Sequence, residues 1–91
     1  MTDVKMQSTF ALSRMADEAE MLADTLHAAL TRLQALRASM LLHIEELAGD
    51  RDHNWDIQAD LGNAETPIHA TAQKARTLSR HARWAVKEQT T

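Results

Sequence analysis

Apolar residues recur along the first half of the chain in alternating steps of three and four, and this pattern restricts the possible folds more than any other feature. Its first position holds Leu12, Ala19, Leu26, Leu33, Met40 and Leu47, and its second position holds Met15, Leu22, Ala29 and Leu36, with His43 next in phase. Such a heptad repeat is typical of a long helix that packs lengthwise against another helix.

The apolar face of this helix is wider than a two-position stripe. One residue beyond the second position lie Ala16, Ala23, Leu30 and Ile44. A two-position stripe suits an isolated two-stranded coiled coil, whereas a three-position face suits a bundle in which each helix has more than one neighbour. With Ser8 or Thr9 as the N-terminal cap and Gly49 as the stop, we expect one helix over about residues 9–48, roughly 60 Å long.

The C-terminal half continues the apolar phase through two residues that disfavour helices, Gly62 and Pro67. The row is formed by Ile57, Leu61, Ala64, Ile68, Thr71, Ala75, Leu78, Ala82 and Ala85. Asp52 or Asn54 is a suitable N-terminal cap for this arm. Pro costs about 3 kcal/mol in a helix interior, but it is tolerated in the first turn after a cap such as Thr66.

We therefore expect a second arm over about residues 53–88 that is kinked or broken near Pro67 into the segments 53–64 and 67–88. Two arms of similar length predict an all-α fold, an antiparallel helical hairpin that turns near residues 49–53. Residues 1–91 are expected to form a single helical domain, with residues 1–7 and 89–91 as frayed tails. Two helices alone leave part of each apolar face in water, so we expect a homodimer in the form of a four-helix bundle.

Charge is distributed unevenly along the chain. Residues 1–66 carry five basic and twelve acidic side chains, a net charge of −7, whereas residues 67–91 carry five basic side chains and one acidic, a net charge of +4. Such asymmetry fits a charged partner, or an acidic helix packed on a basic one within the same chain. We favour the second interpretation because the expected hairpin brings the two halves together.

A basic stripe on the C-terminal helix is the strongest candidate for a binding surface. Arg76, Arg80, Arg83 and Lys87 follow steps of four, three and four, which places them along one line of the helix. Trp84 lies beside this stripe, and Trp55 lies near the expected turn. Trp is enriched at the centres of protein interfaces, so we predict that these six residues contact a partner, although Trp55 also suits a role in covering the flank of the bundle.

No pattern of catalytic or ligand-binding residues is present in the sequence. The chain has no Cys, its two Gly do not form a phosphate-binding loop, and its Ser residues lack the flanking sequence of a nucleophile elbow. The spacing of His27, His53, His69 and His81 does not match a metal-binding motif. His43 occupies the apolar row, where we favour a polar residue that sets the register over a metal ligand or a pH switch. We expect no enzymatic activity, cofactor or metal.

These features predict a small non-enzymatic protein–protein interaction module, a regulator, inhibitor or adaptor that acts as a helical-bundle homodimer. A nucleic-acid-binding bundle that uses the basic C-terminal helix is the first alternative, although the pI of about 5.9 argues against it. A metal-binding helical protein is the second. The start of the chain lacks the apolar segment of a signal peptide, and no apolar run is long enough to span a membrane, so we expect a cytoplasmic protein without a membrane partner.

Small secreted helical-hairpin proteins carry a Trp-x-Gly motif at their turn. The corresponding tripeptide of this chain is Trp55-Asp56-Ile57, and the chain has no Tyr for a tyrosine-based C-terminal signal. We therefore do not assign the chain to that family.

Overall fold

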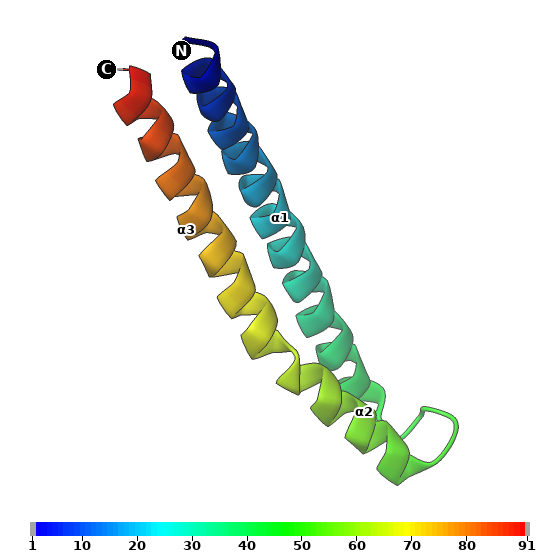
Figure 1. The fold of residues 1–91 in the computed structure, drawn as a ribbon. Helices are drawn as coiled ribbons and strands as arrows, with labels where there is room; N and C mark the ends of the chain where they lie inside the picture. The colour runs from blue at the N-terminus through cyan, green and yellow to red at the C-terminus, as the bar shows by residue number, and fades with distance from the viewer. Residues whose placement is uncertain (1, 91) are drawn as a thin grey trace.

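The computed structural model describes the backbone of residues 2–90 and the side chains of residues 6–89. Within this range the chain forms the helices α1 (Thr2–His43), α2 (Arg51–Asn63) and α3 (Glu65–Thr90) and no strand. Helices α2 and α3 follow one another along α1 in the opposite direction, so the molecule is a rod of 66 × 16 × 14 Å (Figure 1). The turn between α1 and α2 lies at one end of the rod. The expected all-α antiparallel hairpin is confirmed.

Helix α1 begins at Thr2 and ends at His43, so both of its expected bounds, 9 and 48, are wrong. Ser8 and Thr9 lie inside the helix and do not cap it; the Thr9 hydroxyl donates a hydrogen bond of 2.7 Å to Gln89 Oε1 of α3. Residues 2–7 contain neither Gly nor Pro, and extending a formed helix adds one hydrogen bond for each residue fixed. The helix therefore continues to Thr2 without needing a polar cap at the predicted place.

The turn between the arms covers residues 44–50, several residues earlier than expected. The amides of Glu46 and Leu47 donate to the carbonyl of His43 at 2.9 and 3.2 Å, which ends α1 in a tight turn. Gly49 has a φ of +97°, the left-handed conformation predicted for it, but it lies in the turn six residues after the end of α1, so its predicted role as the stop of that helix is wrong.

Asp50 caps α2, in place of the expected Asp52 or Asn54. Its backbone is extended, and its carboxylate accepts a hydrogen bond of 2.9 Å from the amide of Asp52. Asn54 lies inside the helix, where its side-chain amide donates to the carbonyl of Ala48 at 3.2 Å and ties α2 to the turn. Asp50, Asp52 and Asn54 are all suitable N-terminal caps, and Asp50 is the one used because the turn ends earlier than expected.

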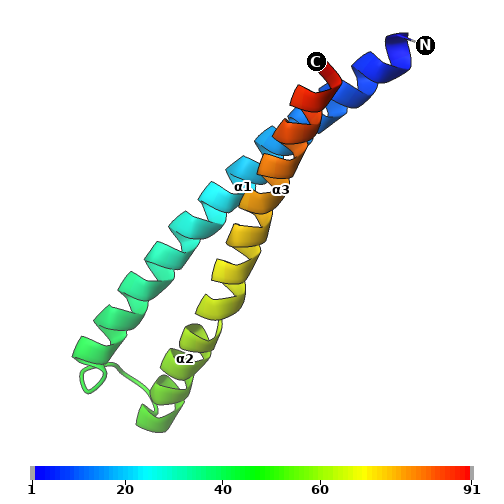
Figure 2. The ribbon, with the colours of Figure 1, turned by 90° about the vertical axis from the view of Figure 1, so that its left-hand side faces the viewer.

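The second arm bends at Ala64, which confirms the expected two segments (Figure 2). The Ala64 amide donates to the carbonyls of Asp60 and Leu61, both at 3.3 Å, and its carbonyl accepts from the amide of Ile68 at 3.3 Å. Pro67 is the third residue of α3, within the first turn, where its missing N–H group removes no helical hydrogen bond. The arm therefore bends before the proline and continues along α1, and Thr66, the expected cap, lies inside α3.

One predicted apolar row of each arm lies between the arms. Each residue of these two rows is buried or half-buried, with the exception of Leu47, which belongs to the turn and is exposed. The confirmed rows are Leu12, Ala19, Leu26, Leu33 and Met40 on α1, and Leu61, Ile68, Ala75 and Ala82 on the second arm.

The other predicted row of each arm is displaced by one residue. On α1 the second inward row is Ala16, Ala23, Leu30, Arg37 and Ile44, while Met15, Leu22, Ala29 and Leu36 are exposed. On the second arm the inward row is Gln58, Glu65, Ala72, Ser79 and Val86. Of the predicted row, Ala64 and Ala85 are half-buried, while Ile57, Thr71 and Leu78 are exposed.

Small residues explain this rotation. Alanine dominates the buried positions between the arms, and the hydroxyl of Ser79 donates a buried hydrogen bond of 2.9 Å to the carbonyl of Ala16 on the facing helix. Two helices approach most closely where small side chains lie between them, and close approach increases the number of dispersion contacts for every residue along the seam. The larger side chains are consequently left at the edge of the contact.

Candidate protein-interaction surfaces

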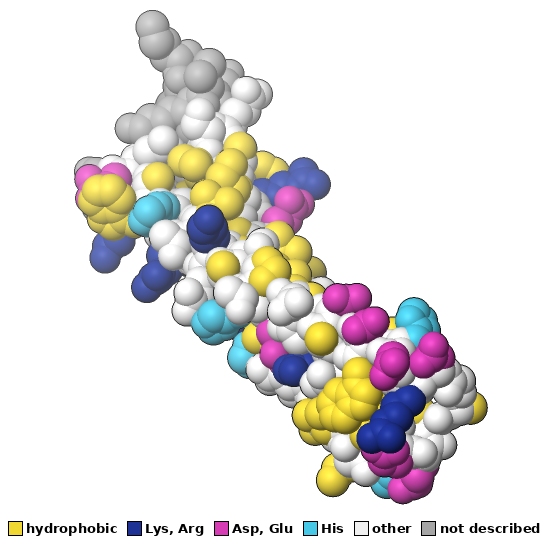
Figure 3. All heavy atoms as spheres, turned by 90° about the horizontal axis from the view of Figure 1, so that it is seen from below, with side chains coloured by type: hydrophobic (Ala, Val, Ile, Leu, Met, Phe, Trp, Pro, Cys, Tyr) yellow, Lys and Arg dark blue, Asp and Glu magenta, His cyan; other side chains and the backbone are white. Residues whose placement is uncertain are grey.

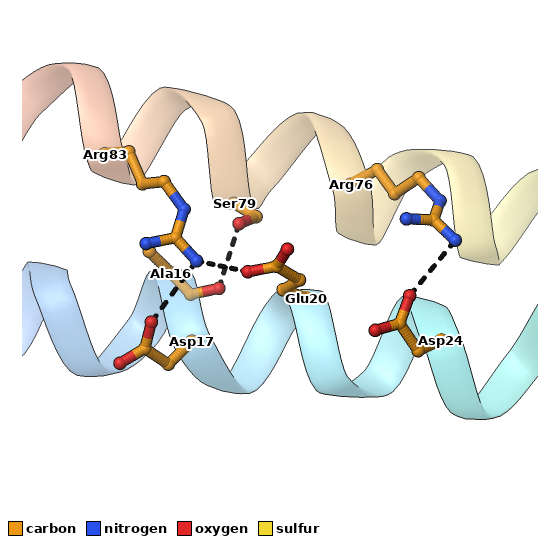
Figure 4. A network of polar contacts seen from close by, with 7 residues as sticks. All are labelled: Ala16, Asp17, Glu20, Asp24, Arg76, Ser79 and Arg83. Carbon is orange, nitrogen blue, oxygen red and sulfur yellow. Dashed lines mark hydrogen bonds and ion pairs between the residues drawn. The ribbon is translucent and has the colours of Figure 1, made fainter.

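The contact between α1 and α3 has a charged edge, which we call the ionic flank. It consists of Asp17, Glu20 and Asp24 of α1 and Arg76 and Arg83 of α3. Arg76 Nη2 lies 3.2 Å from Asp24 Oδ1, and Arg83 Nη2 lies 3.2 Å from Asp17 Oδ1 and also pairs with Glu20 (Figure 4). The hydrogen bond with Glu20 raises the pKa of the Arg83 guanidinium above its usual value, assisted by the charges of both carboxylates.

The ionic flank accounts for part of the charge asymmetry in the sequence. Acidic side chains of α1 pair with basic side chains of α3 within the chain, as the favoured interpretation of that asymmetry predicts. Arg76 and Arg83 of the predicted binding stripe are directed towards these carboxylates (Figure 4). Their role in holding the arms together leaves less of the stripe available to a partner.

Arg80, Trp84 and Lys87 lie on the solvent-exposed side of α3, which we call its outer face. Trp84 is 65% exposed and Lys87 is also exposed. Arg80 is exposed and donates a hydrogen bond of 3.3 Å to Thr77 Oγ1 of its own helix. Because indole is costly to leave in water, this outer face of α3 keeps the features of a protein-binding surface.

Trp55 does not belong to the same surface. It lies in α2, near the turn end of the rod, whereas Trp84 lies in α3, towards the opposite end. Trp55 is 40% exposed, and Leu41, Leu42 and Leu47 are also exposed in this part of the chain. Figure 3 shows hydrophobic side chains at the turn end among acidic and basic ones. The six predicted partner-binding residues therefore form at least two separate surfaces.

A second candidate surface was not predicted from the sequence. On the edge opposite the ionic flank, a groove between α1 and α3 is lined by Phe10, Met15, Leu22, Thr71 and Leu78, with Arg14, Glu18 and Lys74 also contributing. We call this edge, continued along α1 to Leu36, the apolar flank. Met15, Leu22, Leu36 and Leu78 are 44%, 50%, 53% and 47% exposed. The three-position width of the apolar pattern in the sequence indicates such an exposed surface, because a helix with one neighbour covers only part of a face that wide.

His43 is exposed, which contradicts its predicted place in the seam. Its Nδ1 lies 3.3 Å from Glu46 Oε1 at the surface, because the row to which it belongs is the displaced one. Among the residues whose side chains are described, no three His, Asp or Glu residues lie close enough together to hold a metal ion. The described helices also include none that is long and apolar enough to cross a membrane.

Arg37 is a charged residue that the structure places in the seam. Its Nη1 lies 2.7 Å from Glu65 Oε2, and both side chains are largely shielded from solvent. Its guanidinium lies so close to Gly62 that a Cβ there would be 2.7 Å from Nη2, and its Nε is buried without a hydrogen-bond partner. A half-buried ion pair between the two arms favours one register over others, which is the function that the sequence suggested for His43.

No model of a known protein family matches this chain, and no characterised protein or solved structure proved similar to it.

Proposed function

We propose that the chain is a non-enzymatic protein–protein interaction module that pairs with a second copy as a four-helix bundle and presents the outer face of α3 to another protein. The observation that carries this proposal is the exposure of the apolar flank after the hairpin has closed. Rows of large apolar side chains in water are uncommon on monomers and usually mark an interface.

The thin core of the hairpin supports the same proposal. No large side chain is fully buried in the described part of the chain, and the buried apolar residues are mostly alanine. A chain of 91 residues without disulfides has few other means of gaining stability. Self-association adds buried apolar area without any change in the hairpin.

Sedimentation equilibrium tests the self-association. We expect a monomer–dimer equilibrium with an unfolding midpoint that rises with protein concentration, because association stabilises the folded state by mass action. A folded single copy at millimolar concentration, with a midpoint independent of concentration, would refute this part of the proposal.

The outer face of α3 is the part that we assign to a different protein, for which a regulator, inhibitor or adaptor is the fitting role. Trp84 supplies an apolar anchor, and Arg80 supplies an adjacent charge. Replacement of both by Ala should abolish capture of partners from a native lysate while the circular dichroism spectrum is unchanged. Leu42→Ala, at an exposed site on α1, is the matched control. An identical set of captured proteins for the double variant would show that this face is not the binding site.

Nucleic-acid binding is less well supported by the contacts. Two of the three arginines in the basic stripe pair with carboxylates of α1, which reduces the positive charge available to phosphates. Retention on heparin at low salt that falls steeply as salt is raised would favour the nucleic-acid alternative over ours.

A further inference from the structure

The outer face of α3 combines an arginine without a carboxylate partner and an exposed indole. We propose that this face binds a segment of another protein in which a carboxylate lies next to a large apolar side chain, with the carboxylate on Arg80 and the apolar side chain on Trp84. This inference names the chemistry of the partner at the face assigned above and therefore rests on the proposed function.

Arg80 differs from the arginines before and after it in the basic stripe. Arg76 lies 3.2 Å from Asp24 and Arg83 lies 3.2 Å from Asp17, so both are occupied by carboxylates of α1. Among the residues whose side chains are described, no carboxylate lies within ion-pair distance of Arg80. The stripe therefore binds carboxylates within the chain and leaves its middle guanidinium for one from outside.

The guanidinium of Arg80 is held on its own helix. Its Nη2 donates a hydrogen bond of 3.3 Å to Thr77 Oγ1, and the Thr77 hydroxyl donates one of 3.0 Å to the carbonyl of Gln73. A guanidinium has five N–H groups, and a carboxylate bound side-on uses two of them. Enough donors remain for a carboxylate, and a side chain that is already ordered loses less entropy on binding.

A hollow in the surface beside Arg80 gives a carboxylate room to approach. Its volume is about 550 Å³, and its lining includes three guanidinium groups, one carboxylate and neutral polar side chains. These residues are Arg76, Arg80, Arg83, Glu20, Gln73 and Thr77. The excess of basic groups on its walls favours a negatively charged side chain over a positive one.

Trp84 supplies an apolar contact next to this hollow. It lies four residues after Arg80, one turn along the same side of α3 and about 6 Å away along the helix axis, and it is 65% exposed. The single acidic residue of positions 67–91, Glu88, lies one turn beyond Trp84. An acidic group of the partner is therefore attracted on the Arg80 side of the indole and repelled on the Glu88 side.

The balance of charges favours a protein segment over a nucleic acid. On the ionic flank the three carboxylates of Asp17, Glu20 and Asp24 face two arginines, so this flank has no surplus of positive charge. A nucleic acid carries a phosphate on every nucleotide and is bound by several cations in succession, whereas one carboxylate needs a single guanidinium. Arg80 meets the requirement of the carboxylate.

The fluorescence of Trp84 provides a test. Trp55→Phe leaves Trp84 as the only tryptophan, so the emission of this variant reports the surroundings of one indole. The probes are a synthetic peptide of Leu-Glu-Glu repeats, its counterpart of Leu-Lys-Lys repeats and a single-stranded oligouridylate. We expect the acidic peptide to shift the emission to shorter wavelength in a saturable manner that weakens with salt, and the other two probes to leave it unchanged.

Charge reversal at Arg80 tests the assigned residue. In the Trp55→Phe background, Arg80→Glu should weaken binding of the acidic peptide about tenfold or more and create binding of the basic peptide. Arg32→Glu, at an exposed position of α1, is the matched control, because it changes the net charge equally, and it should bind as the parent does. Arg80→Gln should lose the acidic peptide without gaining the basic one, and it replaces Arg80→Glu if circular dichroism shows loss of helix in that variant.

The possible failures are distinct. No shift with the acidic peptide, equal binding of both peptides, or equal effects of Arg32→Glu and Arg80→Glu overturns this inference. Tighter binding of the oligouridylate than of the acidic peptide overturns it in favour of the nucleic-acid alternative. If the double alanine variant at Arg80 and Trp84 loses its captured proteins while the peptides fail in one of these ways, the face binds a protein of different chemistry and the proposed function stands. Unchanged capture overturns the proposed function itself.

Discussion

Leu30→Ala is the most direct test of how the two arms face each other. The side chain of Leu30 is 7% exposed and belongs to the displaced inward row of α1. Leu→Ala at buried sites costs about 2–5 kcal/mol, and the cost is smaller where the surroundings can close on the cavity. The hairpin has solvent on both flanks and only two layers, so its helices can move together. We therefore expect a loss of about 2–3 kcal/mol in the free energy of unfolding.

A loss of this size is easily measured in a small domain. With a urea m-value of about 1–1.5 kcal/mol/M, the unfolding midpoint should fall by about 2 M. Leu42→Ala is the matched control, because the same atoms are removed from a side chain that is 79% exposed. Leu42→Ala should lower the free energy of unfolding by no more than about 0.5 kcal/mol. Urea titration followed by circular dichroism measures both variants.

The alternative register makes a different prediction for Leu30. If Met15, Leu22 and Leu36 faced the second arm, Leu30 would lie at the edge of the contact, and its truncation would cost about 1 kcal/mol or less. Equal midpoints for Leu30→Ala and Leu42→Ala would therefore refute the displaced row and, with it, the exposure of the apolar flank.

Three further predictions concern the polar contacts. Asp50→Ala should destabilise the hairpin by about 1 kcal/mol through loss of the α2 cap, and Asp50→Asn should not, as measured by thermal midpoint. Arg83→Gln should lower the midpoint at low salt and much less at 1 M NaCl, because salt screens exposed ion pairs. The raised pKa of Arg83 means that its contribution is present below the unfolded-state value and is lost only as the pH rises past the folded-state value. We therefore expect Arg83→Gln to lower the midpoint by the same amount at every pH between roughly 6 and 9. Gly62→Ala should bring no net gain, since the new Cβ displaces the Arg37 guanidinium from Glu65, but should stabilise an Arg37→Met variant by about 1 kcal/mol in urea titrations. If Gly62→Ala changed the stability of the unsubstituted chain and of the Arg37→Met variant equally, the close contact between Gly62 and the Arg37 guanidinium would be contradicted.

The sequence by itself determined the local structure. The heptad spacing identified two helical arms, Gly49 marked the turn between them, and Pro67 marked the region of the bend in the second arm. These features depend on contacts between residues that are close in sequence, or on the backbone freedom of a single residue, and they need no knowledge of the facing helix. The exact caps were not predictable, because several polar residues near each end satisfy the same local requirement.

Only the tertiary structure decided which side of each arm lies inside. The apolar pattern of α1 spans three positions, so the periodicity permits two choices of seam. The difference lies in the facing arm, where Ala72, Ala75 and Ala82 allow the helices to approach closely and Ser79 reaches the carbonyl of Ala16. Such complementarity is a property of two surfaces together, and a periodicity read along one helix does not contain it.

The candidate surfaces also depend on how the two arms face each other, and they were therefore only partly predictable from the sequence. The basic stripe was visible in the spacing of Arg76, Arg80 and Arg83, but its division between an ionic flank and an outer face followed from the position of the acidic residues on α1. The residues of the apolar flank were not identified from the sequence, because the heptad pattern assigned them to the buried seam between the arms. They are exposed because a pair of helices has one contact line, and a face three positions wide extends beyond it.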